Sequence, residues 1–203
     1  MKILYIITLA ELGGAQIHLL DLIHGFRHQC EIEVAAGEDG YLLHEARKHG
    51  IVCHVVPDLV WAVSPGKDLR ALRNLMALLR NTHPDLVHVH TSKAGILGRV
   101  AAKLSNIPVV FTAHTWCFAE GRSWKWKLLG PPCERLAALC GGTIINVSSA
   151  NREIALRHRV VPPERLVTIH NGIPDEPLEM GADAVVTGNG DLVWAKVVKD
   201  AES

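Results

Sequence analysis

Short apolar, β-branched runs alternate with longer segments of helical periodicity along most of this chain. Seven runs predict strands at residues 2–8, 31–36, 51–56, 86–90, 109–114, 143–148 and 166–170. Six intervening segments carry apolar residues at helical spacing, at residues 14–27, 41–49, 67–81, 93–105, 125–139 and 150–158. Strands that are apolar on both faces and linked by helices indicate a parallel sheet covered on both sides, with right-handed crossovers. The pattern therefore predicts an α/β fold with a doubly wound, Rossmann-like parallel sheet.

The alternation continues to about residue 174, which sets the expected extent of the domain. With 48% hydrophobic residues in 203, the chain can bury the core of one domain of this size. Residues 175–203 instead predict a polar linker and a short hairpin, with strands AVVTG and DLVWAKVV around a Gly-Asn-Gly turn. We therefore expect one Rossmann-like domain at 1–174 and a short appendage at 175–203.

Charge and cysteine content argue against several classes of protein. The 21 basic and 21 acidic residues balance, and no long Lys/Arg run is present, so nucleic acid is not an expected partner. The five cysteines are an odd number without a Cys-x-x-Cys pair, a pattern typical of reduced thiols in a cytoplasmic protein. No apolar run approaches the roughly 20 residues that cross a bilayer. We expect a cytoplasmic protein.

In sheets of this kind ligands bind beyond the carboxyl ends of the strands, so the loops there are the candidate site. The first loop ends in Gly13-Gly14 and opens a helix, where backbone N–H groups and the positive helix end can approach a phosphate. A simple tight turn explains the two glycines equally well. The loop after residues 143–148 places Ser149 as a helix N-cap, which helix initiation alone explains.

Histidines lie at or near the carboxyl ends of two neighbouring predicted strands. His88 and His90 lie on one face of a strand; we expect His88 to be a hydrogen-bonded core residue and His90, at the strand end, to face the ligand. After His90, Ser92 can cap the next helix and Lys93 can meet an anion.

His114 ends the neighbouring strand beside Trp116, whose ring suits a sugar or base face, and His90 and His114 could converge. The histidines could also suggest zinc, but no His-x-x-x-His, carboxylate triad or cysteine partner completes a site, so we expect no metal.

Five segments together resemble the amino-terminal domain of GT-B glycosyltransferases of family 4. They are ITLAELGGAQIHLLDL, HVHTSKAGILGRVAAKL, FTAHTWCF, VSSANREIALR and IHNGIPD, in the family's order and spacing over residues 1–175. HTSKAGILGR in particular resembles versions from bacterial capsule, exopolysaccharide and lipopolysaccharide assembly. The resemblance implies a retaining transfer of a hexosyl group from a nucleotide-diphosphate sugar to a glycan or lipid-linked acceptor, with no metal or other cofactor. Cell-surface polysaccharide biosynthesis is the implied process.

The resemblance also implies roles for particular residues. His114 would be the active-site histidine that hydrogen-bonds the transferred sugar, and Gly13 and Gly14 would lie under the donor phosphates. The other substrate-binding residues implied, with His90 and Trp116 from the loop analysis, are Ala15 and Gln16 at the helix start, Ser92, Lys93 and Arg99 nearer the acceptor, and Asn151, Asn171 and Gly172 toward the domain junction.

Family members carry a second domain with a phosphate-binding Arg/Lys pair and a Glu-x7-Glu motif, and no two glutamates here stand eight apart. We therefore expect transfer to need a complementing carboxyl-terminal, donor-binding domain. Alternatives are a non-catalytic glycan- or nucleotide-binding module and a truncated gene product. The stretch RSWKWKLLG alternates cations with indoles, which suggests a peripheral inner-membrane contact; a solvated helix start with inward tryptophans is the simpler explanation.

Overall fold

The computed structural model describes residues 1–121 and 123–172, and its main compact unit runs from Met1 to His170. Among these described residues, seven strands form one wholly parallel sheet in the order β3-β2-β1-β4-β5-β6-β7. They are β1 (Lys2–Ile7), β2 (Glu31–Ala36), β3 (Val52–Val55), β4 (Leu86–His90), β5 (Val109–Ala113), β6 (Thr143–Asn146) and β7 (Leu166–Thr168). The predicted doubly wound sheet is confirmed, and its strand order reverses direction between β1 and β4.

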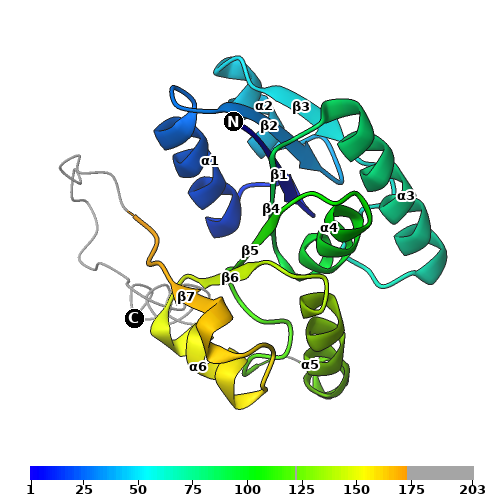
Figure 1. Cartoon of the computed structure of the whole chain (residues 1–203), viewed down its shortest axis with the longest axis vertical. Helices are drawn as coiled ribbons and strands as arrows, with labels where there is room; N and C mark the ends of the chain where they lie inside the picture. Colours follow the sequence, from blue (N-terminus) through cyan, green and yellow to red (C-terminus); the bar gives the residue numbers. More distant parts are fainter. Residues whose placement is uncertain (122, 173–203) are drawn as a thin grey trace, which may run out of the picture. The chain divides into compact units, whose positions relative to one another are not determined.

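In the part of the chain that the structure describes, six α-helices connect the strands, each at a predicted position to within two residues. They are α1 (Gly14–Phe26), α2 (Tyr41–Lys48), α3 (Pro65–Thr82), α4 (Ser92–Leu104), α5 (Trp124–Ala138) and α6 (Ser149–Arg157), followed by the short 3-10 helix η1 (Pro163–Arg165). Figure 1 shows α1 on one side of the central strands and α3 and α4 on the other. The predicted linker and hairpin of residues 175–203 lie outside the described residues.

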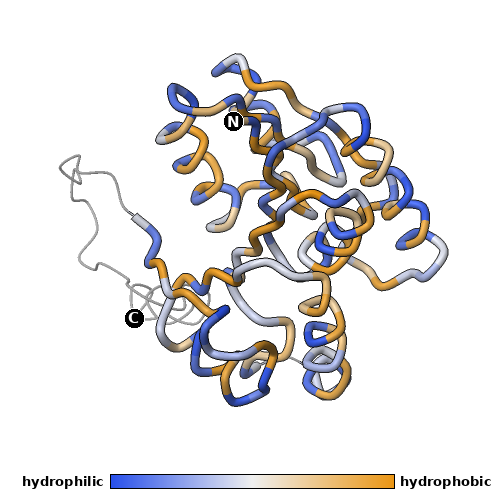
Figure 2. The backbone as a smooth tube through the Cα atoms, in the orientation of Figure 1, coloured by the Kyte–Doolittle hydropathy of each residue, from blue (hydrophilic) through white to orange (hydrophobic). Residues whose placement is uncertain are grey.

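The sheet separates two apolar cores because side chains alternate along each strand. Along β1, Tyr5 and its same-face neighbours pack with α1 and α2, whereas Leu4 and Ile6 face the core that contains α3 and α4. The central strands are mostly apolar (Figure 2). On the second face α4 lies very close to the sheet, since a Cβ on Gly98 would stand 2.5 Å from Cγ1 of Val89.

Two helix starts differ from the prediction. Ser92 and Ser149 were expected to be N-caps, but each is the first helical residue, and the caps are Thr91 and Ser148. The Ser148 hydroxyl oxygen accepts a hydrogen bond from the Asn151 N–H at 3.2 Å, which satisfies one free donor of α6. Thr91 has a φ of 66°, and its hydroxyl group pairs with that of Thr8 instead of capping the helix.

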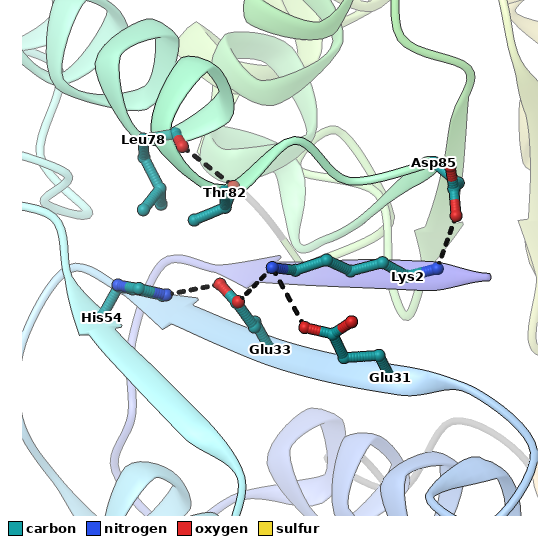
Figure 3. A network of polar contacts seen from close by, with 7 residues as sticks. All are labelled: Lys2, Glu31, Glu33, His54, Leu78, Thr82 and Asp85. Carbon is teal, nitrogen blue, oxygen red and sulfur yellow. Dashed lines mark hydrogen bonds and ion pairs between the residues drawn. The ribbon is translucent and has the colours of Figure 1, made fainter.

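A charged network connects β1, β2 and the edge strand β3 and includes Lys2 and Glu31, the first residues of β1 and β2 (Figure 3). The Lys2 ammonium lies 2.5 Å from a carboxylate oxygen of Glu33 and 3.2 Å from Glu31, and His54 Nε2 lies 2.7 Å from the other Glu33 oxygen. Burial alone would raise the pKa of Glu33, but hydrogen bonds from Lys2 and His54 outweigh it and lower that pKa. The network therefore joins β1, β2 and β3 through one ionised carboxylate.

Candidate functional site

The loops after β1 and β4 meet at the point where the strand order reverses. The Ala94 N–H donates to the Thr8 hydroxyl oxygen at 3.1 Å, and the Thr8 and Thr91 hydroxyl oxygens are 2.8 Å apart. Because Thr8 is buried, these bonds fix the start of α4 against the end of β1. Neither threonine was predicted as a site residue, since a threonine at a strand end has no distinctive sequence pattern.

The Gly13-Gly14 turn opens α1 beside open space. A Cβ on Gly14 would meet no atom within 4 Å, whereas a Cβ on Gly13 would stand 2.8 Å from Oε1 of Gln16. The Gln16 side chain folds back and donates to the Leu9 carbonyl at 2.9 Å, so it braces the loop. The first N–H groups of any helix, here those of Gly14 and Ala15, lack intrahelical partners and carry partial positive charge. This end of α1 can therefore hold an anion.

His90 and His114 converge, as predicted. Nδ1 of His90 lies 3.1 Å from Nε2 of His114, and the two rings stack at 5.4 Å between centroids. His18 of α1 joins them, its ring 5.2 Å from that of His114. His18 was not predicted as a site residue; the signal in the sequence was its place one helical turn after Gly14. The helix that begins at the glycine turn thus contacts the histidine that follows β5.

The histidine cluster is neutral around pH 7. Burial, reinforced by the neighbouring imidazoles, lowers the pKa of His88 and of His114 to about 3 and lowers that of His90 well below 6.5. Burial also lowers the pKa of His18, against the opposing effect of Asp21. These rings can therefore donate and accept hydrogen bonds but do not supply positive charge.

His88 has the core role predicted for it. Its Nε2 lies 2.8 Å from the Thr112 hydroxyl oxygen on the adjacent strand, and its ring packs 4.3 Å from that of His90. Lys93 occupies the first turn of α4, where its ammonium pairs with Asp68 of α3 at 2.7 Å. An anion that binds Lys93 would therefore compete with Asp68 for the ammonium group. Ser92, which precedes Lys93 in the chain, is partly exposed.

The structure does not bring Arg99 to the surface, where the acceptor contact implied by the resemblance would need it. Arg99 is 1% exposed and pairs with Glu134 of α5, which is wholly buried. Its Nε donates to the Gly95 carbonyl at 2.7 Å, and its guanidinium lies 4.5 Å above the centroid of the Phe111 ring. Arg99 thus joins α4, α5 and the sheet inside the protein, and an acceptor contact by this side chain is incompatible with its burial.

Trp116 is likewise interior, not the ligand platform that we expected. It is fully buried, and its indole N–H donates to the Asn151 carbonyl at 2.9 Å. The Asn151 amide in turn donates to the carbonyls of Ala113 and His114, at 3.2 and 2.8 Å. Asn151 therefore holds the backbone of His114 in place from α6. Asn171 and Gly172 fall beyond the unit that ends at His170 and are not assigned to this site.

Within residues 1–121 and 123–172, no three histidine, cysteine or acidic side chains are grouped so as to hold a metal ion. In the same part of the chain, no helix combines the length and the apolar character needed to cross a membrane.

The sequence matches Glycosyltransferase Family 4 over residues 12–177. It is 31% identical over 195 residues to UDP-Gal:alpha-D-GlcNAc-diphosphoundecaprenol alpha-1,3-galactosyltransferase of Escherichia coli, covering 90% of this chain and 49% of that one. It is 30% identical over 188 residues to alpha-maltose-1-phosphate synthase of Mycolicibacterium smegmatis, covering 86% and 45%. The chain therefore spans about half the length of the curated relatives it matches.

Solved structures show the same fold. HepE of Anabaena in complex with UDP-glucose superposes with a TM-score of 0.66 at 21% identity, over 85% of this chain and 44% of that one. MurG of Acinetobacter baumannii gives a TM-score of 0.61 at 15% identity, over 88% and 47%. Since the family match covers residues 12–177, most of the described sheet and its loops, the chain belongs to glycosyltransferase family 4.

Proposed function

We propose that this chain is the acceptor-side half of a retaining glycosyltransferase of cell-surface polysaccharide biosynthesis. It would bind a nucleotide-diphosphate sugar, without a metal or other cofactor, and transfer a hexosyl group to a glycan or lipid-linked acceptor. The Escherichia coli relative is named for UDP-galactose and a diphosphoundecaprenol acceptor, and the HepE structure holds UDP-glucose, which supports this substrate class.

One observation carries the proposal: the open, positively polarised start of α1 and the neutral His114 are neighbours. His18, one turn along α1 from Gly14, is 5.2 Å from His114 between ring centroids. A diphosphate at the helix start would thus place its attached sugar near a ring that forms hydrogen bonds without adding charge. Because the relatives are about twice as long, we propose that a complementing half supplies the remaining donor contacts.

The proposal includes a cytoplasmic location with a peripheral membrane contact. A lipid-linked acceptor lies in a bilayer, so the transferring protein must approach that surface.

The first test is donor binding to the purified chain, measured by calorimetry with UDP, GDP and their sugars. Gly14→Ala should weaken binding at least tenfold, because the added methyl group fills the space at the helix start without touching any protein atom. Gly25→Ala is the matched control, since Gly25 also lies in α1 and its Cβ would also meet nothing within 4 Å. Equal binding by both variants would refute the phosphate site.

The second test is transfer to a lipid-linked acceptor, with a carboxyl-terminal half of a family member added. His114→Asn should lose transfer while its unfolding curve stays close to that of the parent chain; His28→Asn, at an exposed position, should match the parent. Glycan or nucleotide binding with no transfer under any condition would favour the non-catalytic binding module.

A further inference from the structure

Helix α5 has an apolar face that no described segment covers. Five large apolar side chains of this helix and its C-cap are between 58% and 77% exposed: Trp124, Leu128, Leu129, Leu136 and the C-cap residue Leu139. Leu129 and Leu136 stand seven residues apart, so they lie on one stripe of the helix. A helix in water normally turns polar side chains outward, which makes this arrangement typical of a surface that meets another apolar phase.

The charges of α5 specify the partner. Its exposed cations are Lys125, Lys127 and Arg135, and its one carboxylate, Glu134, is buried against Arg99. The exposed side of the helix is therefore apolar and positive, with indoles next to the lysines at one end. Indoles and lysines are the side chains that favour the boundary of an anionic bilayer.

We propose that α5 lies in the surface of an anionic bilayer, with its leucines in the acyl boundary and Lys125 and Lys127 among the headgroups. A second copy is disfavoured, because a two-fold contact between α5 faces would bring like charges together. With 15 residues the helix is too short to span, so it lies along the surface. Since α5 and His114 both follow β5, this contact would deepen the proposed function by holding the acceptor side near lipid-linked substrates.

The test is sedimentation of the full chain with vesicles of phosphatidylcholine, alone or mixed with phosphatidylglycerol, at low and high salt. The chain should bind the anionic vesicles and be released by salt. Replacing Lys125 and Lys127 together by serine should weaken binding about 30-fold, and Leu136→Ser about tenfold. Trp61→Ser and Lys67→Ser, at exposed positions on other elements, are the controls and should bind like the parent.

Three outcomes would overturn this proposal. They are no binding to either vesicle, equal binding to neutral and anionic vesicles, and a dimer in light scattering that Leu136→Ser dissociates. The assay needs no transfer, so its result does not depend on whether the proposed enzymatic activity is found.

The histidine pair carries a second, independent inference. Nδ1 of His90 faces Nε2 of His114 at 3.1 Å, and two neutral rings share one hydrogen at such a contact. Nε2 of His90 is buried and has no partner among the described residues. If Nε2 of His114 donated the hydrogen, the hydrogen of the neutral His90 ring would sit on its buried Nε2 as an unpaired N–H, which is the rarer and costlier kind of unsatisfied group. If Nδ1 of His90 donates instead, Nε2 of His90 is only an unpaired acceptor.

The geometry points to His90 as the donor, a positioning residue that fixes His114 with its hydrogen on Nδ1. The Nδ1–H of His114 would then be a hydrogen-bond donor to the substrate; only this last step rests on the proposed function. Nitrogen-15 NMR of the histidine-labelled full chain should show His114 protonated at Nδ1 and unprotonated at Nε2. His90→Phe should move the hydrogen of His114 to Nε2 or mix the two tautomers, whereas His28→Asn should leave it in place. Protonation of His114 at Nε2 in the parent chain would overturn the assignment even if the His90 variant fails to fold.

Discussion

Replacing Arg99 with methionine should destabilise the fold by about 3–5 kcal/mol, the cost of breaking a buried ion pair by removing one partner. Methionine retains much of the apolar stem, so the loss comes mainly from the charge. The substitution removes the hydrogen bonds to Glu134 and to the Gly95 carbonyl, as well as the contact over Phe111. Glu134 would then be a wholly buried carboxylate without a counter-charge.

The destabilisation should depend on pH in a defined direction. Burial raises the pKa of Glu134 above 4.5 even with Arg99 present, and losing Arg99 removes the main opposing effect. A carboxyl whose pKa is higher in the folded than in the unfolded chain favours folding at low pH, and that contribution is lost as the pH rises through the folded pKa. The deficit of Arg99→Met should therefore be largest at neutral pH and shrink as the pH falls toward 4.5.

Urea denaturation followed by circular dichroism, at several pH values, measures this directly, provided the slopes with denaturant agree. The double variant Arg99→Met, Glu134→Leu is the control, because replacing both partners by apolar groups is often neutral or stabilising. A loss below about 1 kcal/mol in Arg99→Met, combined with weakened acceptor binding, would refute this account of a buried ion pair and restore Arg99 to the acceptor-side role that the resemblance implied.

Three further predictions test other parts of the structure. Gly98→Ala should cost about 1–3 kcal/mol in urea unfolding, because its methyl group would overlap a buried valine on β4; no change would mean that α4 can move away from the sheet. Asn151→Leu should cost about 1–3 kcal/mol, since it removes the buried amide that donates to the carbonyls of Ala113 and His114, and should lower transfer with the complementing half; parent-like values in both would remove its role in holding His114. Lys2→Met should cost on the order of 1–2 kcal/mol at pH 7 by removing a cation that keeps the pKa of Glu33 low. That paired carboxylate stabilises the fold above pH 4.5, so parent and variant should converge at lower pH, and a deficit independent of pH would contradict this account.

Much of the site followed from the sequence because parallel strands end at one edge of a sheet. Once His90 and His114 were assigned to the ends of adjacent strands, their proximity followed, and the structure places them 3.1 Å apart between nitrogens. The core role of His88 followed in the same way, from its place two residues before the strand end. These conclusions required only strand positions, strand direction and an alternation of two along the strand.

Residues that depend on helix neighbours could not be predicted. Glu134 stands 35 residues from Arg99 in the sequence, and nothing local to HTSKAGILGR shows that α5 covers that side of α4. Trp116 is a residue type that often stacks on ligands, but here it is buried, and its indole N–H is bonded to the Asn151 carbonyl of α6. His18 joins the site only because α1 packs beside the end of β5.

The sequence by itself determined which segments are strands and helices, their order, and which loops share an edge, because hydrophobic period and strand length are properties of each segment. Only the tertiary structure decided which polar and aromatic side chains are buried and which face of α5 is left open. The physical reason is that burial depends on what packs against a residue, and for Arg99, Trp116 and His18 the neighbour comes from a distant part of the chain.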